Sequence, residues 1–389
     1  MKTIRIFALL SGLIMASACT DGKFTMNTEI HADGTCSREI RFMADSATLV
    51  DSTQRNIPYL NRVLGSQYWQ KTWRVKGPKS DVFAGEEMPY PMSQAQYDSV
   101  AALCVDNKKS KSVKDTVLVH ARRDFRSVEE MAELCPITVA GRQISSAPKF
   151  EKKFRWFYTE YTYTERFESF APAFKIQLCP MYMTEDFANY WLTGYPNLAK
   201  GFSGAEMKDL NENLELSFGR YVNANRLRDV VEIIGDNYSS IENAPMAWPE
   251  MRDRMAAYYY SDSLSGDYVN FEPEKFITKV LHSDVYEKAL AENPKLMRDE
   301  SLYSSLYMLG VQCCIAMPGQ IVDVDECSNG HIGEGGLYYY RLTGFRLLAP
   351  HYEIGVTSRE RHTWALAITV IFALAMLFFA GRYLWRYGR

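Results

Sequence analysis

Apolar and polar residues alternate near both ends of the chain, which is the pattern of strands with one buried face. Residues 24–30 and 36–42 alternate on either side of Asp33-Gly34, a dipeptide that favours a tight hairpin turn. Strand patterns return towards the C-terminus in three stretches, 301–325, 337–347 and 352–360. Both ends of the chain are therefore predicted to form β-structure.

The middle of the chain, about 184–296, changes to helical spacing, with apolar residues three, four and seven or eight positions apart. Ser203 with Glu206, and Ser127 with Glu130, have the spacing of capping boxes, which mark helix starts. Strands at both ends with helices between them predict an α+β fold. The N- and C-terminal strands are expected to share one sheet, with the helix-rich middle as an insertion.

The segment 149–167, KFEKKFRWFYTEYTYTERF, carries the strongest strand signal in the chain. Its aromatic residues fall at both parities, so either both faces are covered or one is an exposed aromatic surface. An ordinary core strand explains the pattern, but a run of aromatic rings is also typical of faces that bind sugars or lipids. The candidate ligand surface consists of Phe154, Trp156, Tyr158, Tyr161 and Tyr163.

The first 18 residues have the three parts of a secretory signal peptide: a basic start, an apolar core and a small-residue cleavage site. The apolar core, 6–15, covers roughly 15 Å as a helix, about half of a bilayer core. Ala16-Ser17-Ala18-Cys19 resembles the lipobox of bacterial lipoproteins, so we predict cleavage before Cys19 and lipidation of its thiol. Plain secretion with an unmodified Cys19 is the alternative.

An uncharged stretch of nineteen residues, 363–381, precedes the C-terminus. At ~1.5 Å per residue it covers roughly 28 Å, about the thickness of a hydrocarbon core, so we predict a transmembrane helix. Arg382, Arg386 and Arg389 place this end in the cytoplasm and the bulk outside it, at the inner (plasma) membrane. The expected organisation is a signal peptide (1–18), an extracytoplasmic domain (19–362), a transmembrane helix (363–384) and a cytoplasmic tail (385–389).

Composition fits a folded body, since 47% of the residues are hydrophobic and 13% are aromatic. A formal charge of -3 is nearly neutral and gives no argument for a nucleic-acid partner. Eight cysteines less Cys19 leave an odd number, so at least one thiol stays unpaired or bridges chains in an oxidising compartment. Cys313 and Cys314 are expected to point to opposite faces of a strand. Two alternatives stay open: one of them forms a disulfide with Cys327, or both are unreactive thiols in the core.

Candidate catalytic motifs do not exceed chance. Ser146 and Lys149 have the spacing of a penicillin-binding nucleophile motif, but Pro148 opposes the helix that this motif needs. The acidic cluster at 323–326 could bind calcium, although a solvated strand end explains it. The glycines of 331–336 predict a hairpin loop rather than a phosphate cradle. We therefore expect no catalytic residue, no cofactor and no metal site, with an envelope hydrolase as the least favoured alternative.

A triplet of Asp, then Ser or Thr, then a small apolar residue or Thr occurs five times, where composition predicts on the order of one. It resembles the O-glycosylation sequon of exported Bacteroidota proteins, and glycans there require an exposed surface. Turn-forming Asp-Ser pairs are the alternative explanation. The candidate acceptors are Ser46, Ser52, Ser99, Thr116 and Ser263.

The stretch from Met317 to Trp364 contains Pro318-Gly319, Tyr340-Arg341-Leu342 and Ser358-Arg359. With the DGTCSREIRF hairpin, these pieces resemble LppM-like bacterial lipoproteins and related uncharacterised Bacteroidota lipoproteins that carry a C-terminal anchor. The resemblance covers the two ends of the chain and not its middle. It implies a β-rich envelope domain near the plasma membrane that contacts lipid or glycolipid, and it carries over no catalytic residue.

These observations together predict a non-enzymatic, membrane-anchored envelope lipoprotein. Its ectodomain is expected to bind a protein or lipid partner at the inner membrane. The alternative is a lipid- or glycolipid-handling module that uses the aromatic surface.

Overall fold

The computed structural model describes most of the chain between Phe24 and Gly388. The described residues are 24–44, 46–50, 61–76, 83–106, 113, 116–139, 142–173, 181–194, 196–268, 270–290, 310–325, 330–350 and 352–388. The predicted signal peptide, Cys19, Ser52, Cys327 and Glu326 lie outside them.

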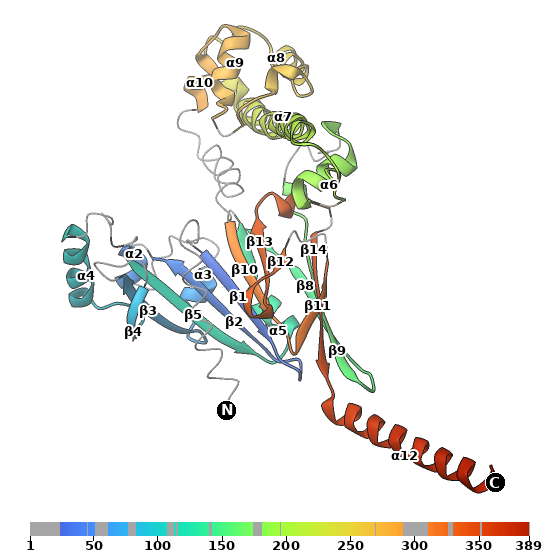
Figure 1. The fold of residues 1–389 in the computed structure, drawn as a ribbon. Coiled ribbons are helices and arrows are strands. Elements are labelled where there is room, and N and C mark those ends of the chain that lie inside the picture. Colours follow the sequence, from blue (N-terminus) through green and yellow to red (C-terminus); the bar gives the residue numbers. More distant parts are fainter. Residues whose placement is uncertain are drawn as a thin grey trace.

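An eight-stranded sheet, sheet A, combines strands from both ends of the chain (Figure 1). All neighbours in it pair antiparallel except β1 and β10, which are parallel. The predicted sharing of one sheet by N- and C-terminal strands is confirmed. In spatial order its strands are β12 (His331–Ile332), β13 (Tyr338–Thr343), β10 (Gly310–Ala316), β1 (Phe24–Ile30), β2 (Cys36–Met43), β5 (Val117–Phe125), β3 (Gln70–Lys76) and β4 (Phe83–Pro89).

A four-stranded antiparallel sheet, sheet C, packs against one face of sheet A, and one of its strands leads into the C-terminal helix. Its strands in spatial order are β11 (Gln320–Val324), β14 (Tyr352–Arg361), β9 (Tyr158–Phe167) and β8 (Ser146–Phe154). The stretch predicted as a strand over 149–167 is therefore two strands of a hairpin, with its turn at 155–157. A separate pair is formed by β6 (Ile137–Val139) and β7 (Arg142–Ile144).

Short helices accompany the strands of sheet A. Ser127 accepts a hydrogen bond from the Glu130 backbone N–H at the start of α5, as its spacing predicts. Pro136 follows directly after the end of this helix, where Cys135 is the C-cap. These helices are α2 (Ser46–Val50), α3 (Asn61–Leu64), α4 (Gln94–Asp106) and α5 (Val128–Leu134).

A helical lobe is inserted between β9 and β10, within the stretch predicted to be helical (Figure 1). The predicted capping box of Ser203 and Glu206 is present at the start of its longest helix. The Phe218 ring contacts Phe345, whose centroid lies 5.1 Å away in the loop after β13, and so joins the lobe to the sheets. The lobe consists of α6 (Glu185–Thr193), α7 (Gly204–Asp236), α8 (Trp248–Ala256), α9 (Pro273–Leu281) and α10 (Val285–Leu290).

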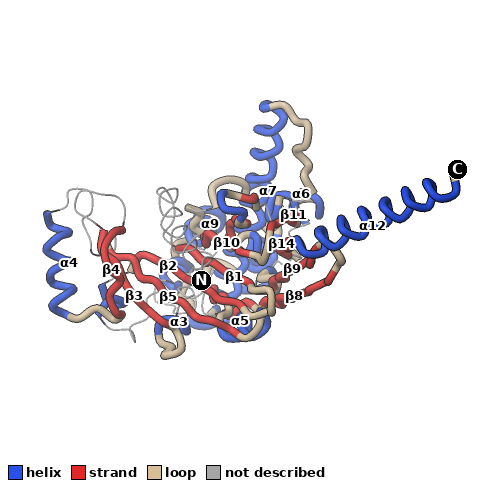
Figure 2. Tube along the Cα trace, turned by 60° about the horizontal axis from the view of Figure 1, so that its bottom comes forward, coloured by secondary structure: helices blue, strands red, loops and turns tan. Residues whose placement is uncertain are grey.

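The C-terminal helix, α12 (Thr363–Tyr387), leads away from the body in both views (Figures 1 and 2). Its side chains are almost all exposed, although it is apolar on every face. A helix of this length and composition is able to cross a membrane. The α+β fold with a single C-terminal apolar helix agrees with the sequence prediction for the described residues.

Candidate functional site

The exposed aromatic side chains of the β8–β9 hairpin gather at its turn, which we call the hairpin tip (Phe154, Arg155, Trp156 and Phe157). Phe154 is 63% exposed, Trp156 49% and Phe157 43%. A hydrogen bond of 2.8 Å from the Arg155 N–H to the Tyr158 carbonyl closes the turn. The structure thus concentrates the exposed rings at one end of the hairpin.

The predicted aromatic surface is only partly formed. Tyr161 and Tyr163 are 2% and 0% exposed, because they point inward from β9 among the core residues. Tyr163 donates a hydrogen bond of 2.8 Å to Glu165, and Tyr161 donates one of 2.9 Å to Glu360. The expectation of one continuous ligand face is wrong for these two residues. Tyr158 is half-buried, and the guanidinium carbon of Arg359 lies over its ring, 4.6 Å from the ring centroid.

The hairpin tip lies against the first turns of α12. The rings of Trp156 and Trp364 meet edge to face, with centroids 5.4 Å apart. The Trp156 indole N–H also donates a hydrogen bond of 3.1 Å to the hydroxyl of Thr369, almost two turns into the helix. The tip is thus fixed beside the apolar helix by both ring contact and hydrogen bonding.

His362, the single residue between β14 and α12, is held by the same hairpin. Its backbone N–H donates to the Phe157 carbonyl at 2.9 Å, and its Nδ1 lies 3.2 Å from the Trp156 carbonyl. A carbonyl only accepts, so Nδ1 carries the proton, and Nε2 lies 2.9 Å from the Thr159 hydroxyl. The ring stacks between Phe154 and Trp364. These contacts fix the direction in which the helix leaves the sheet.

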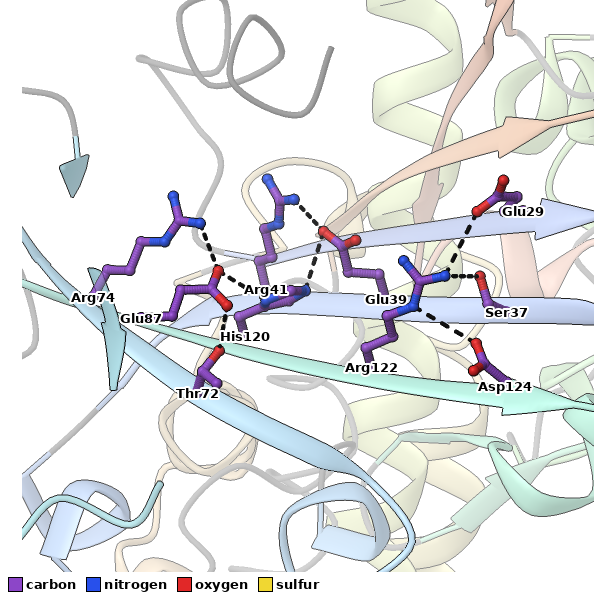
Figure 3. Close-up of polar contacts among 10 residues, drawn as sticks. All are labelled: Glu29, Ser37, Glu39, Arg41, Thr72, Arg74, Glu87, His120, Arg122 and Asp124. Atoms are coloured by element: carbon purple, nitrogen blue, oxygen red, sulfur yellow. Dashed lines mark hydrogen bonds and ion pairs between the residues drawn. The ribbon is translucent and has the colours of Figure 1, made fainter. Parts of the chain in front are cut away.

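A second cluster, the charged row, crosses five neighbouring strands on the face of sheet A away from sheet C (Figure 3). Its side chains alternate with core residues along β2 and β5, so the row lies on one face of these strands and the mostly apolar core residues on the other. The charged row consists of Glu29, Ser37, Glu39, Arg41, Thr72, Arg74, Glu87, His120, Arg122 and Asp124.

His120 stands at the centre of the charged row between two carboxylates. Its Nε2 lies 3.3 Å from Glu39 Oε1, and its Nδ1 lies 3.3 Å from Glu87 Oε1 (Figure 3). Carboxylates are anionic, so both contacts are ion pairs when the ring carries both protons. Arg41 pairs with Glu39, and Arg74 pairs with Glu87 at 2.6 Å. Each of the two carboxylates therefore has two cationic neighbours when His120 is protonated.

These neighbours control the acidity of the two carboxyl groups. Burial acts to raise the pKa of Glu39, but the close contact with His120 and the charge of Arg41 outweigh it and lower the pKa to about 2. Burial also acts to raise the pKa of Glu87, but the charges of His120 and Arg74 outweigh it, so this pKa is lowered. Both groups are stable anions at neutral pH. Glu39 and Glu87 are therefore poorly suited to giving up a proton at neutral pH.

The end of the charged row that contains Arg122 and Asp124 is open to solvent. Arg122 lies 3.8 Å from Glu29 and 3.6 Å from Asp124, and donates a hydrogen bond of 3.3 Å to the Ser37 hydroxyl. Asp124 is the most exposed charge of the row. Sequence reasoning missed this cluster, although the alternation of charged with apolar residues in 36–43 and 117–125 could have indicated a polar sheet face.

A buried polar network joins sheets A and C. Arg38 on β2 and Glu165 on β9 are both almost fully buried, with Arg38 Nη2 3.9 Å from Glu165 Oε2. Burial opposes the charge of Arg38, but Glu165 outweighs it, so the pKa of Arg38 is raised. Ser146 donates to the other Glu165 oxygen at 2.7 Å. Ser146 therefore binds a core carboxylate. It lies on β8, a strand that also contains Pro148, so no nucleophile motif is formed.

The described cysteines are buried, free thiols: Cys36, Cys104, Cys135, Cys313 and Cys314. Burial raises the pKa of Cys36, Cys313 and Cys314 to about 12, so these groups stay protonated and unreactive at neutral pH. Among the residues that the structure describes, no group of three or more His, Cys, Asp or Glu could hold a metal ion.

The candidate glycosylation residues differ in accessibility. Ser46, Ser99 and Ser263 are exposed, on α2, on α4 and in a short turn at Asp262–Leu264. Thr116 is buried, with its Oγ1 3.2 Å from the Cys104 sulfur, so the folded chain leaves no room for a glycan there. Thr116 must therefore be removed from the exposed candidates.

The comparisons with known proteins add no family to this picture. The chain matches no protein-family model, no curated protein sequence and no solved structure.

Proposed function

We propose that this protein is a membrane-anchored binding protein whose folded body stands outside the cytoplasm and recognises a partner through the charged row. In this proposal α12 crosses the inner membrane with its arginine-rich end in the cytoplasm, and a lipid on Cys19 provides a second anchor. The partner of the charged row is a protein at the membrane surface.

The observation that carries the proposal is the direct passage of β14 into α12. Only His362 separates a strand in the middle of sheet C from a helix that is apolar on every face and almost fully exposed. An isolated apolar helix is unfavourable in water, because each exposed apolar side chain costs free energy that a bilayer removes. A membrane therefore accounts for a surface that the folded body leaves uncovered.

The state of the buried thiols and of the two central carboxylates favours a binding role over catalysis by these groups. The thiols of Cys313 and Cys314 are buried and protonated, and Glu39 and Glu87 are held as anions by their cationic neighbours. General acid–base catalysis requires a group whose pKa lies near the working pH. An ordered set of fixed charges of both signs instead suits recognition of a complementary protein surface.

Membrane anchoring is tested by extraction of membranes with alkaline carbonate and by protease treatment of intact spheroplasts. The chain is expected to remain in the pellet, and its body to be digested from outside. Cys19→Ser should abolish labelling by a fatty-acid analogue without releasing the chain, because α12 alone suffices to hold it. Release of the wild-type chain by carbonate would contradict the proposal.

Partner recognition is tested by a photo-crosslinking amino acid placed in the full chain at Asp124, on the open end of the charged row. The matched control places the same group at Glu250, which is exposed on α8 of the helical lobe. A crosslinked protein is expected from position 124 and not from position 250, and Arg122→Glu should abolish it. Equal yields at both positions, or no product from position 124, would exclude the charged row as the binding surface.

A further inference from the structure

We infer that the hairpin tip is a second membrane contact, inserted in the interfacial layer of the same leaflet that α12 enters. Phe154, Trp156 and Phe157 are the inserted rings, and Arg155 with Arg361 contact the phosphates of lipid headgroups. This inference rests on the proposed membrane anchoring and adds to it a fixed depth for the folded body.

The depth follows from the hydrogen bond between Trp156 and Thr369. The uncharged stretch from Thr363 to Gly381 spans roughly 28 Å as a helix, close to the ~30 Å of a hydrocarbon core. If the tip stood in water, Thr369 would stand there too, and the thirteen residues from Thr369 to Gly381 would cover only roughly 20 Å. A full span therefore draws the tip into the bilayer surface.

The chemistry of the tip suits that layer. Three large rings are exposed within four residues of the turn. Trp156 contacts Trp364 at the start of α12 directly, and Phe154 is joined to it through the ring of His362. Aromatic rings are favoured at the boundary between headgroups and acyl chains. The indole N–H of Trp156 already has a partner in Thr369, so the ring loses no hydrogen bond when water leaves.

Cations flank the rings at the level of the headgroups. Arg155 follows Phe154 in the turn, and Arg361 is the last residue of β14; both are exposed. Neighbouring cations are already paired, Lys153 with Glu151 at 2.8 Å and Arg359 with Glu160 at 2.8 Å. Arg155 and Arg361 have no ion-pair partner among the residues that the structure describes, so both are available to an anionic lipid.

The test uses the full chain in lipid nanodiscs, with an environment-sensitive fluorescent amino acid in place of Phe157. A matched control carries the same probe in place of Phe202, an exposed aromatic residue just before α7 in the helical lobe. Lipids brominated near the top of the acyl chain should quench the probe at 157 and leave the probe at 202 unaffected. Aqueous iodide should give the opposite order.

The headgroup contact is tested by adding anionic phospholipid to the nanodiscs. The occupancy of the tip by anionic lipid, read from the emission of the probe at 157, should rise with the share of that lipid. Each of Arg155→Gln and Arg361→Gln should reduce that rise by about fivefold, the effect of one cation near an anionic surface. A rise that survives the loss of both arginines would overturn the phosphate contact.

Two results would overturn the insertion itself. Iodide quenching at 157 as strong as at 202 would place the tip in water, and protection from both quenchers would mean that protein covers it. Either result, in a chain that still resists carbonate, leaves the proposed membrane anchoring intact. Release by carbonate is the separate failure of the anchoring.

Discussion

Arg38 and Glu165 show at the scale of single residues how this protein uses charge. Both are buried between the sheets, where the cost of removing two charges from water is offset by their attraction and by hydrogen bonds from Tyr163 and Ser146. Alternation placed Arg38 on the inward face of its strand with Ile40 and Phe42. Its partner could not be predicted, because Glu165 lies 127 positions later on a sheet whose packing no local pattern specifies.

Glu165→Ala should lower the free energy of unfolding by about 3–5 kcal/mol, because it leaves the Arg38 guanidinium buried and unpaired. Arg38→Met with Glu165→Met should recover most of this loss, since it removes both charges. Denaturant unfolding of the detergent-solubilised protein, followed by tryptophan fluorescence, measures the difference. Glu168→Ala, at an exposed position after β9, is the control and should change little. A single variant as stable as the double one would show that the pair does not matter.

Glu39 makes part of the stability depend on acid pH. Its folded pKa of about 2 lies below the ordinary value of 4.5, so its contribution is complete above pH 4.5 and is lost as the pH falls towards 2. Glu39→Gln should therefore flatten the decline in unfolding free energy between these pH values, by on the order of 2–3 kcal/mol. Unfolding curves across this range measure it, with Glu133→Gln on the exposed side of α5 as the control. Parallel curves for Glu39→Gln and wild type would refute the assignment.

At the scale of elements, the β8–β9 hairpin shows a turn that the local sequence pattern does not predict, whereas other turns and helix starts were predictable. The N-terminal hairpin was predictable because Asp33-Gly34 favours a turn, and the capped helices were predictable from Ser127 and Ser203. The turn at 155–157 contains no Gly, Pro, Asn or Asp, so the segment resembled one strand. Its contacts with His362 and α12 supply the stabilisation that its own residues do not.

The proposed anchoring role of α12 leads to a prediction for charge at its centre. Ala373→Arg should reduce the carbonate-resistant fraction, because a central arginine costs about 2.5–3.5 kcal/mol of insertion free energy. Leu384→Arg is the matched control, since an arginine near the end of the helix extends to the headgroups. Quantitative immunoblots of pellet and supernatant measure the two fractions. Equal resistance for both variants would argue against a spanning helix.

At the scale of the whole molecule, both ends of the chain build one sheet, and the helical lobe is an insertion into it. Alternating strands at the two ends and helical spacing between them were enough to predict this arrangement. The parallel pairing of β1 with β10 and the division into two sheets were not predictable, because both depend on contacts between distant segments. The charged row depends on the pairing of β2 and β3 with β5, which are distant segments of the chain, and so was missed.

Close packing in the helical lobe gives a prediction at this scale. A Cβ added at Gly219 of α7 would lie 2.5 Å from the carbonyl oxygen of Gly266, which cannot move aside as a side chain could. Gly219→Ala should destabilise the lobe by about 1–3 kcal/mol, whereas Gly204→Ala on the same helix meets no atom within 4 Å and should be tolerated. Faster limited proteolysis within the lobe, at unchanged rates in the sheets, is the expected result. Identical digestion of both variants would contradict it.

The one-residue connection at His362 has a mechanical consequence. With no swivel between sheet and helix, tilting or rotating α12 about its axis turns the whole body with it, and a force on the body acts as torque on the helix. If α12 spans a membrane as proposed, the charged row is then held at a constant height and orientation over the lipid. Binding of a partner protein to this oriented surface would cost less rotational entropy than binding to a freely rotating one, so a smaller contact free energy would give a stable complex.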